Sequence, residues 1–432
     1  MKDKILRFIK RPFIRNVTII ASGTATAQVI TMLLSPIITR LYGPEVYGLM
    51  GVFMAIVGVI VPISALTYPI AIVLPKSDKD AKGLIYLSLY VSVIITIIIT
   101  FTLLFLKQPI VDLFQIKEVS SYLFLIPLVI LSSGILQVIE QWLYRTNQFR
   151  ITAKTIFLHA LILQGSIIGI GIFYPVATVL ITLSALGNGL KAIIMILIVR
   201  NSNYKKSINL SKKNISIKSL AKTYNDFPIY RAPEVFLNAA SQSLPILLLS
   251  SFFGPASAGF YTIAKTALGA PSQLIGKAIG DVFYPRISQA ANKDENLTIL
   301  IKKATTLLFL IGIIPFGIVI IFGPWIFSFV FGEEWVVAGE YARWIALWSF
   351  FMFINRPAVK SLPVLSAQAF HLTFTLITLI TRVLVLIIGY YVFADDIVAV
   401  AFFGVSGALL NIFLILKTLK ISKKYDKLNK VK

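Results

Sequence analysis

The chain has 432 residues, of which 57% are hydrophobic and 14% are charged, and its formal net charge is +23. A water-soluble protein of this size could not cover so many apolar side chains with so little polar surface. The lack of cysteine excludes disulfides, thiolate metal sites and a cysteine nucleophile, and two histidines are too few for a histidine-built metal centre.

The chain begins with a basic segment, residues 1–15, in which apolar side chains are interleaved with lysine and arginine. No small-residue cleavage site follows a short apolar core, so the segment does not read as a signal peptide. We expect an amphipathic helix that lies on the inner leaflet of a membrane.

Twelve long apolar stretches follow, and each is long enough to cross a hydrocarbon core of ~30 Å as a helix. They lie at 16–38, 46–74, 84–106, 121–143, 154–173, 177–199, 228–252, 258–284, 304–327, 338–356, 367–393 and 397–416. The stretches are apolar on every face, unlike the alternating strands of a membrane β-barrel. The sequence therefore predicts an all-α polytopic membrane protein with twelve transmembrane helices.

Lysine and arginine concentrate in alternate connections between these stretches. The basic connections and ends hold 31 of the 41 basic residues, whereas the intervening connections hold three of them but eight of the 18 acids. Because short basic loops stay in the cytoplasm, we predict a protein of the cytoplasmic (inner) membrane with both termini inside. The positive charge then orients the chain and meets anionic lipid head groups, so nucleic acid is not an expected partner.

The two halves of the chain resemble each other at three places in the same order. The matching pairs are 42–48 with 253–259, 75–76 with 285–286, and 109–114 with 324–329. Six helices per half is an even number, so the halves form a parallel repeat, and we expect two six-helix lobes related by a pseudo-two-fold axis along the membrane normal. The predicted divisions are an N-terminal segment 1–15, an N-lobe 16–199, a basic cytoplasmic linker 200–227, a C-lobe 228–416 and a basic tail 417–432.

Three motifs carry a resemblance to a known family. They are the "TRLYGPEVYGL" of residues 39–49, the "GFYTIAK" of residues 259–265 and the "FGEEWVVAGEY" of residues 331–341. Together with the twelve-span layout, they resemble the polysaccharide transporter family, the Wzx-type O-antigen and capsule flippases of the MOP superfamily, which also contains the MATE transporters. The resemblance implies alternating access that flips an undecaprenyl-diphosphate-linked oligosaccharide. It also implies a polysaccharide polymerase and a chain-length regulator as partners.

Charged residues within the spans are the candidate functional residues, because charge inside a bilayer is costly. A lipid diphosphate is anionic, and we expect four cations to bind it: Lys265, Arg382, Arg231 and Arg40. Lys265 and Arg382 fall in the outer half of the bilayer, far from the nearest helix end. Candidates for ion pairs or for coupling to an ion are Glu234, Lys277, Asp281 and Glu140.

Two of these candidates have a partner at helical spacing, Arg231 with Glu234 and Lys277 with Asp281. Glu140 lies near the cytoplasmic end of its span, and Lys191 is expected to reach the same interface along its aliphatic stem.

Other functions fit the sequence less well. It contains no phosphate-binding loop, no clustered catalytic residues and no metal-ligand pattern, so we predict no cofactor and no enzyme activity. A polysaccharide polymerase or ligase would usually carry a large extracytoplasmic loop, and the outside connections here are short. The nearer alternatives are a lipid II flippase and a cation-coupled multidrug exporter, but an exporter of cations should favour acids in its cavity, whereas the mid-membrane charges here are basic.

The predicted orientation is testable by thiol labelling, because the chain contains no cysteine of its own. A single cysteine introduced by Ser211→Cys should resist an impermeant thiol reagent in intact cells, since the linker is expected inside. A cysteine introduced by Glu333→Cys should react. The opposite labelling pattern would invert the topology.

Overall fold

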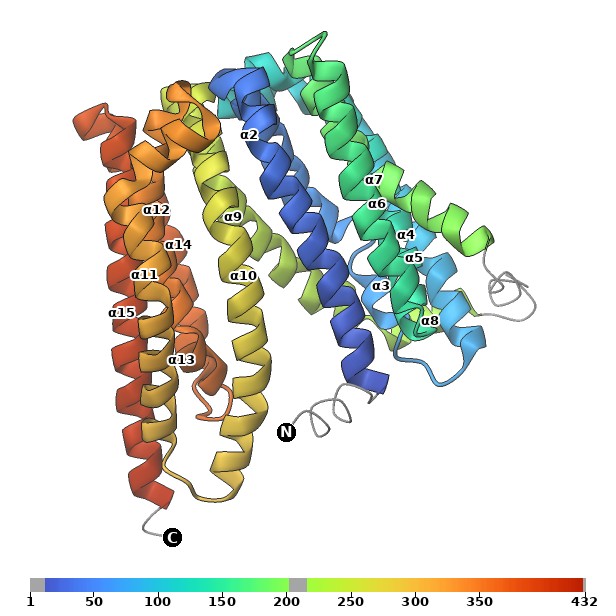
Figure 1. Cartoon of the computed structure of the whole chain (residues 1–432). Helices are drawn as coiled ribbons and strands as arrows, with labels where there is room; N and C mark the ends of the chain where they lie inside the picture. The colour runs from blue at the N-terminus through green and yellow to red at the C-terminus, as the bar shows by residue number, and fades with distance from the viewer. Residues whose placement is uncertain (1–11, 202–215, 430–432) are drawn as a thin grey trace. The chain divides into compact units, whose positions relative to one another are not determined.

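The computed structural model describes residues 12–201 and 216–429, and the side chains of these residues except 12–17, 113, 270–282, 285 and 429. All regular structure in the described ranges is helical. The chain divides into two compact units, Met1–Leu247 and Leu248–Lys432. Each unit is a bundle of long helices joined by short connections (Figure 1).

The first unit contains two long helices, α2 and α4, followed by three shorter ones that complete its bundle. The elements are α2 (Pro12–Ile60), the 3₁₀ turn Val61–Ile63, α3 (Tyr68–Ala71), α4 (Asp78–Phe114), the 3₁₀ segment Lys117–Leu125, α5 (Ile126–Arg145), α6 (Phe149–Gly171), α7 (Ala177–Arg200), α8 (Ile217–Thr223), the π-helical turn Phe227–Arg231 and the first part of α9 (Ala232–Phe253).

The second unit takes the end of α9 and the remaining helices. These are α10 (Pro255–Asn292), α11 (Leu297–Phe331), the 3₁₀ turn Glu333–Trp335, α12 (Val336–Ile354), α13 (Arg356–Ser361), α14 (Gln368–Ile388), the π-helical turn Gly389–Phe393 and α15 (Asp396–Asn429).

Most helices overlap the predicted spans, but the predicted span 46–74 is not one helix, because α2 ends at Ile60 and the short α3 follows. Within the described residues, nine segments are long and apolar enough to cross a membrane, and the first of them, Thr18–Ile63, covers most of the first predicted span and the start of the second. The predicted spans 258–284 and 338–356 lie on α10 and α12, which are not among the nine. The all-α multi-pass architecture is confirmed, and the number of twelve crossings stays a prediction.

The first sequence match between the halves is also a match of backbone geometry. Gly43 (φ 70°, ψ 171°) interrupts α2, and Gly254 (φ 92°, ψ 173°) separates α9 from α10. A positive φ costs glycine little, and the proline that follows each glycine is suited to begin the next helix. The same local turn therefore joins the first two spans of each half.

The boundary between the compact units falls inside α9, whereas the predicted lobe boundary precedes it. The segment before α9 is bonded to the first unit: the Thr67 hydroxyl donates to the Phe227 carbonyl (3.0 Å), and the Tyr68 hydroxyl donates to the Ala221 carbonyl (3.4 Å). These bonds attach the segment that leads into α9 to the first unit. The predicted assignment of the whole seventh span to the C-lobe stays a proposal.

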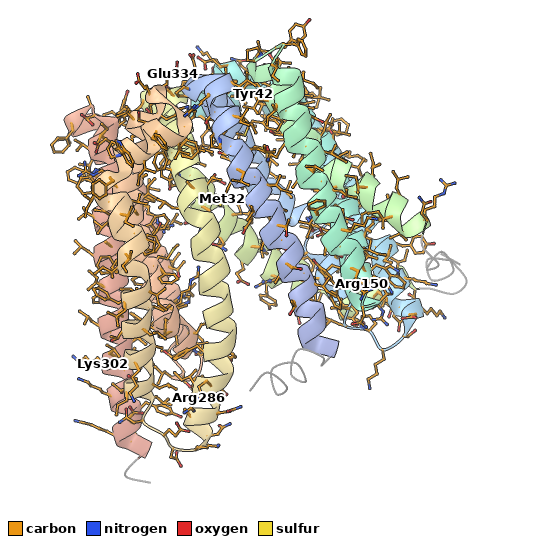
Figure 2. The ribbon with its side chains drawn as sticks, in the orientation of Figure 1. Met32, Tyr42, Arg150, Arg286, Lys302 and Glu334 are labelled. Atoms are coloured by element: carbon orange, nitrogen blue, oxygen red, sulfur yellow. The ribbon has the colours of Figure 1, made fainter. Side chains whose placement is uncertain are left out.

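Basic residues gather at one end of each unit. Figure 2 shows Tyr42 and Arg150 at opposite ends of the first unit, and Glu334 opposite both Arg286 and Lys302 in the second. Arg286, in the last part of α10, pairs at 2.6 Å with Glu295 of the connection to α11, and this hydrogen bond lowers the pKa of the Glu295 carboxyl group. The arrangement within each unit agrees with the charge alternation along the sequence.

Close helix packing in the second unit requires small residues. A Cβ at Gly404 of α15 would lie 2.4 Å from the Trp344 carbonyl oxygen of α12, whereas a Cβ at Gly317 of α11 would have no neighbour within 4 Å. In membranes such close backbone approach is a main source of helix association, because lipid is as apolar as the side chains.

We therefore expect opposite effects from two glycine substitutions in this unit. Gly404→Ala should destabilise the purified protein by about 1–3 kcal/mol through overpacking. Gly317→Ala should be neutral or stabilise by up to ~1 kcal/mol, since alanine is the better helix former. Thermal unfolding followed by tryptophan fluorescence measures both. Equal effects of the two variants would contradict the close packing of α12 and α15.

Candidate functional site

The main candidate site is a pair of cations inside the second unit. Arg382 lies on α14 with its guanidinium carbon 4.8 Å from the centre of the Trp348 ring and 5.6 Å from that of Phe403. The two rings, from α12 and α15, meet edge to face at 5.2 Å. Aromatic faces stabilise a cation most where water is scarce, so this cradle suits a charge within a helix bundle.

Lys265 joins Arg382 in this site from α10. Tyr261 lies one turn before Lys265, on the same face of α10, and its ring is 6.0 Å from that of Phe403, the ring that also lies beside Arg382. The structure thus places on one group of packed helices the two mid-membrane cations that the sequence singled out, although they are far apart in the chain. Positive charge on two such residues is what the binding of an anion would require.

The other candidate cations lie elsewhere. Arg231 pairs with Glu234 at 2.8 Å, as their spacing predicted, but the two side chains are 50% and 66% exposed. Exposed pairs contribute little energy, so this one carries no functional argument. Arg40 lies exposed on α2. Lys277 and Asp281 belong to the part of α10 whose side chains lie outside the described residues.

Glu140, a candidate for an ion pair, is paired in the first unit with a partner that the sequence did not name. The Lys191 ammonium on α7 lies 2.7 Å from a carboxylate oxygen of Glu140 on α5, and each side chain is only 21% exposed. The sequence placed both residues near the cytoplasmic interface but did not connect them, because they lie on different helices. Each charge neutralises the other, which lowers the cost of placing both within membrane-spanning helices.

This ion pair belongs to a polar seam between α5 and α7. Asn188 donates to the Ser133 hydroxyl (2.9 Å), and Gln137 donates to the Ser64 hydroxyl (3.1 Å). Ser133, Gln137 and Glu140 share one face of α5, and Asn188 and Lys191 share one face of α7. That spacing of polar residues within apolar spans is the signal by which the sequence could have revealed the seam.

His159 of α6 lies beside the same seam. A Cβ at Gly187 on α7 would lie 3.6 Å from its Nε2 atom. That nitrogen is buried and has no hydrogen-bond partner among the described residues. The first unit therefore combines a carboxylate, an ammonium and an imidazole within three adjacent helices.

The described residues contain no group of three or more histidine, cysteine or acidic side chains that could hold a metal ion. The chemistry that the two sites offer is electrostatic. The second unit presents positive charge beside aromatic rings, and the first unit holds a neutralised pair.

Comparisons with known proteins identify the family of the chain and solved structures that share its fold. The family model described as "Polysaccharide biosynthesis protein" matches residues 37–340. No curated protein sequence matches the chain.

Solved structures share the fold at low sequence identity. A multidrug resistance MATE family transporter of the MOP superfamily in an inward-facing conformation has 14% identity and a TM-score of 0.72, with 92% of this chain and 96% of that chain covered. The lipid II flippase MurJ in an inward closed conformation has 16% identity and a TM-score of 0.70, with coverage of 93% and 89%. The Vibrio cholerae MATE transporter VcmN has 14% identity and a TM-score of 0.58, with 96% of each chain covered.

The seam in the first unit makes a prediction about stability. Lys191→Met leaves the Glu140 carboxylate partly buried without its partner. We expect a loss of about 1–3 kcal/mol, between the values for exposed and for buried pairs. Glu140→Gln combined with Lys191→Met should recover at least half of the loss, and Arg231→Met at the exposed pair should change stability by less than ~0.5 kcal/mol. Thermal unfolding of the wild type, Glu140→Gln, Lys191→Met and the double variant completes the cycle, and additive single effects would contradict the ion pair.

Proposed function

Because the chain belongs to the polysaccharide biosynthesis protein family, we propose that it is a flippase for an undecaprenyl-diphosphate-linked oligosaccharide in the cytoplasmic membrane. The cation pair of Lys265 and Arg382 carries this proposal. A diphosphate offers several anionic oxygens, and two adjacent positive charges match that charge better than one. The MATE-like fold supports transport by alternating access, in which the site opens first to one side of the membrane and then to the other.

The two cations have different roles in the proposed binding step. The Arg382 guanidinium is planar and can bind two phosphate oxygens at once. Trp348 and Phe403 orient this plane, so less rotational freedom is lost when the diphosphate binds. Lys265 acts as a point charge on the neighbouring phosphate. The polyprenyl chain stays in the lipid, and the oligosaccharide follows the diphosphate through the aqueous path.

A cation-coupled multidrug exporter is the alternative from the same superfamily. Such a protein requires negative charge where its cargo binds. In the first unit, the Glu140 carboxylate is neutralised by Lys191 at 2.7 Å. In the second unit, the charges at the candidate site are positive. This distribution supports an anionic cargo and argues against the exporter.

The proposal predicts loss of glycan export on removal of either cation. Lys265→Ala and Arg382→Ala should each weaken diphosphate binding about 10–100-fold, because hydrogen bonds to charged groups contribute about 1.5–3 kcal/mol. Arg382→Lys should retain part of the activity, since the charge remains but the fork is lost. Export is measured as the amount of surface glycan on cells whose own copy of the gene is deleted and that carry each variant on a plasmid. Affinity is measured as binding of undecaprenyl diphosphate to the purified protein.

Lys302→Ala is the matched control, because Lys302 is an exposed lysine at the basic end of the second unit (Figure 2). Membrane content of each variant shows that the protein is folded and inserted. Normal glycan export by the Lys265→Ala, Arg382→Ala double variant would overturn the proposed role of the site.

A further inference from the structure

The first unit contains an apolar cavity that the proposed transport does not use. It lies between α4, α5 and α7 and has a volume of about 390 Å³. Its walls include Leu89 of α4, Ile139 and Trp142 of α5, and Ile196 of α7. The one charged residue among its lining residues is Arg200. A volume of this size suits a small ligand or part of a larger one, and walls without polar groups suit a hydrocarbon rather than a sugar.

The position of Arg200 gives the cavity a polar end and an apolar end. Arg200 is the last residue of α7, and Trp142 and Leu143 lie in the last turn of α5. The apolar wall continues along α5 to Ile135, about 12 Å away at the rise of an α-helix. Tryptophan at the membrane interface with arginine beside it marks the level of the lipid head groups. The cavity therefore extends from head-group level into the hydrocarbon.

Arg200 is available to a ligand. Its side chain is exposed, and it makes no hydrogen bond or ion pair with any other residue in the described parts of the chain. An arginine fork that has no partner among the described residues, placed at the rim of an apolar cavity, matches the phosphate of a lipid whose chain fills that cavity.

The short helix α8 adds positive charge to the same edge. Leu220 and Ala221 pack against the apolar cluster that contains Ile85 and Trp142, two residues that also line the cavity. Lys218 and Lys222, four residues apart in α8, are exposed. Basic residues directly after a membrane helix attract anionic lipid head groups.

We propose that this cavity is a binding site for an anionic glycerophospholipid of the inner leaflet. One acyl chain fills the space between α4, α5 and α7, and the phosphate binds Arg200. Lys218 and Lys222 add attraction for a head group with negative charge. The site belongs to the first unit alone and is independent of the cargo site in the second unit. A lipid bound there bridges α4, α5 and α7 and stabilises their packing.

Native mass spectrometry of the full-length protein in detergent tests the proposal, with phosphatidylglycerol and phosphatidylcholine added in turn. The wild-type protein should bind one phosphatidylglycerol more tightly than any further lipid, and more tightly than phosphatidylcholine. Arg200→Gln should reduce the preference for phosphatidylglycerol about fivefold, which is the usual effect of one basic residue near a lipid head group. Arg150→Gln removes an exposed arginine that does not line the cavity, and it should leave the preference unchanged.

A second pair of variants tests the cavity itself. Ile139→Trp fills the space and should abolish tight binding of either lipid. Ile193→Trp adds the same side chain on α7 at an exposed position outside the cavity, and it should bind lipid as the wild type does. Thermal unfolding shows that each variant is folded.

Three results would overturn the proposal. The first is unchanged binding in Ile139→Trp, and the second is an equal loss of preference in Arg150→Gln and Arg200→Gln. The third is displacement of phosphatidylglycerol by an equal concentration of undecaprenyl phosphate, which would assign the cavity to the cargo. Glycan export by the Lys265 and Arg382 variants reports on the proposed transport separately, so the two ideas can fail independently.

Discussion

The structure depends on one constraint: within hydrocarbon, every backbone donor and acceptor must be bonded inside the protein. This requirement makes each crossing a helix, and it leaves close packing and internal polar contacts to hold the helices together. Both means are present in the second unit. Gly323 of α11 and Gly339 of α12 approach so closely that a Cβ on either would lie 2.6 Å or less from backbone atoms of the other helix. In the same unit, Asn355, which lies between α12 and α13, donates a hydrogen bond to Asn411 of α15.

The same constraint decides what a charge inside the bundle can mean. The Glu140–Lys191 pair is neutral as a unit and therefore suits a role in joining α5 to α7. Arg382 and Lys265 carry the same sign, and aromatic rings beside the arginine reduce the cost of placing its charge among membrane helices. Charged residues at such depth are costly, which makes these two the candidates for contact with a charged ligand. This difference separates the candidate anion site from the structural pair.

The sequence predicted the helices and the turns between them, because apolar length and Gly-Pro pairs are local signals. Gly43 and Gly254 were matched by sequence, and their backbone angles agree. The sequence could not predict which residues far apart in the chain contact each other. Glu140 and Lys191 are 51 positions apart, and nothing in either span names the other as a partner. The sequence also contained no signal for the apolar cavity beside Arg200, because the residues that line it have the same composition as any lipid-facing surface. The sequence singled out Lys265 and Arg382 only by their expected depth in the membrane. That they lie on the same group of packed helices is a result of the fold.

The two halves of the chain carry different charges at positions that the repeat aligns. At the offset that relates Gly43 to Gly254, Lys265 corresponds to Met54, so Lys265 has no charged counterpart at the matching position of the first unit. At the offset that relates Pro109 to Pro324, Glu140 corresponds to Asn355. Glu140 and Asn355 each bond to the last long helix of their own half. Glu140 forms an ion pair with Lys191, and Asn355 donates an amide hydrogen bond to Asn411. The polar link between the fourth and sixth spans is thus common to both halves, whereas the cation at Lys265 belongs to the second half. The proposed anion site therefore rests on a feature in which the two halves differ, and not on the scaffold that they share.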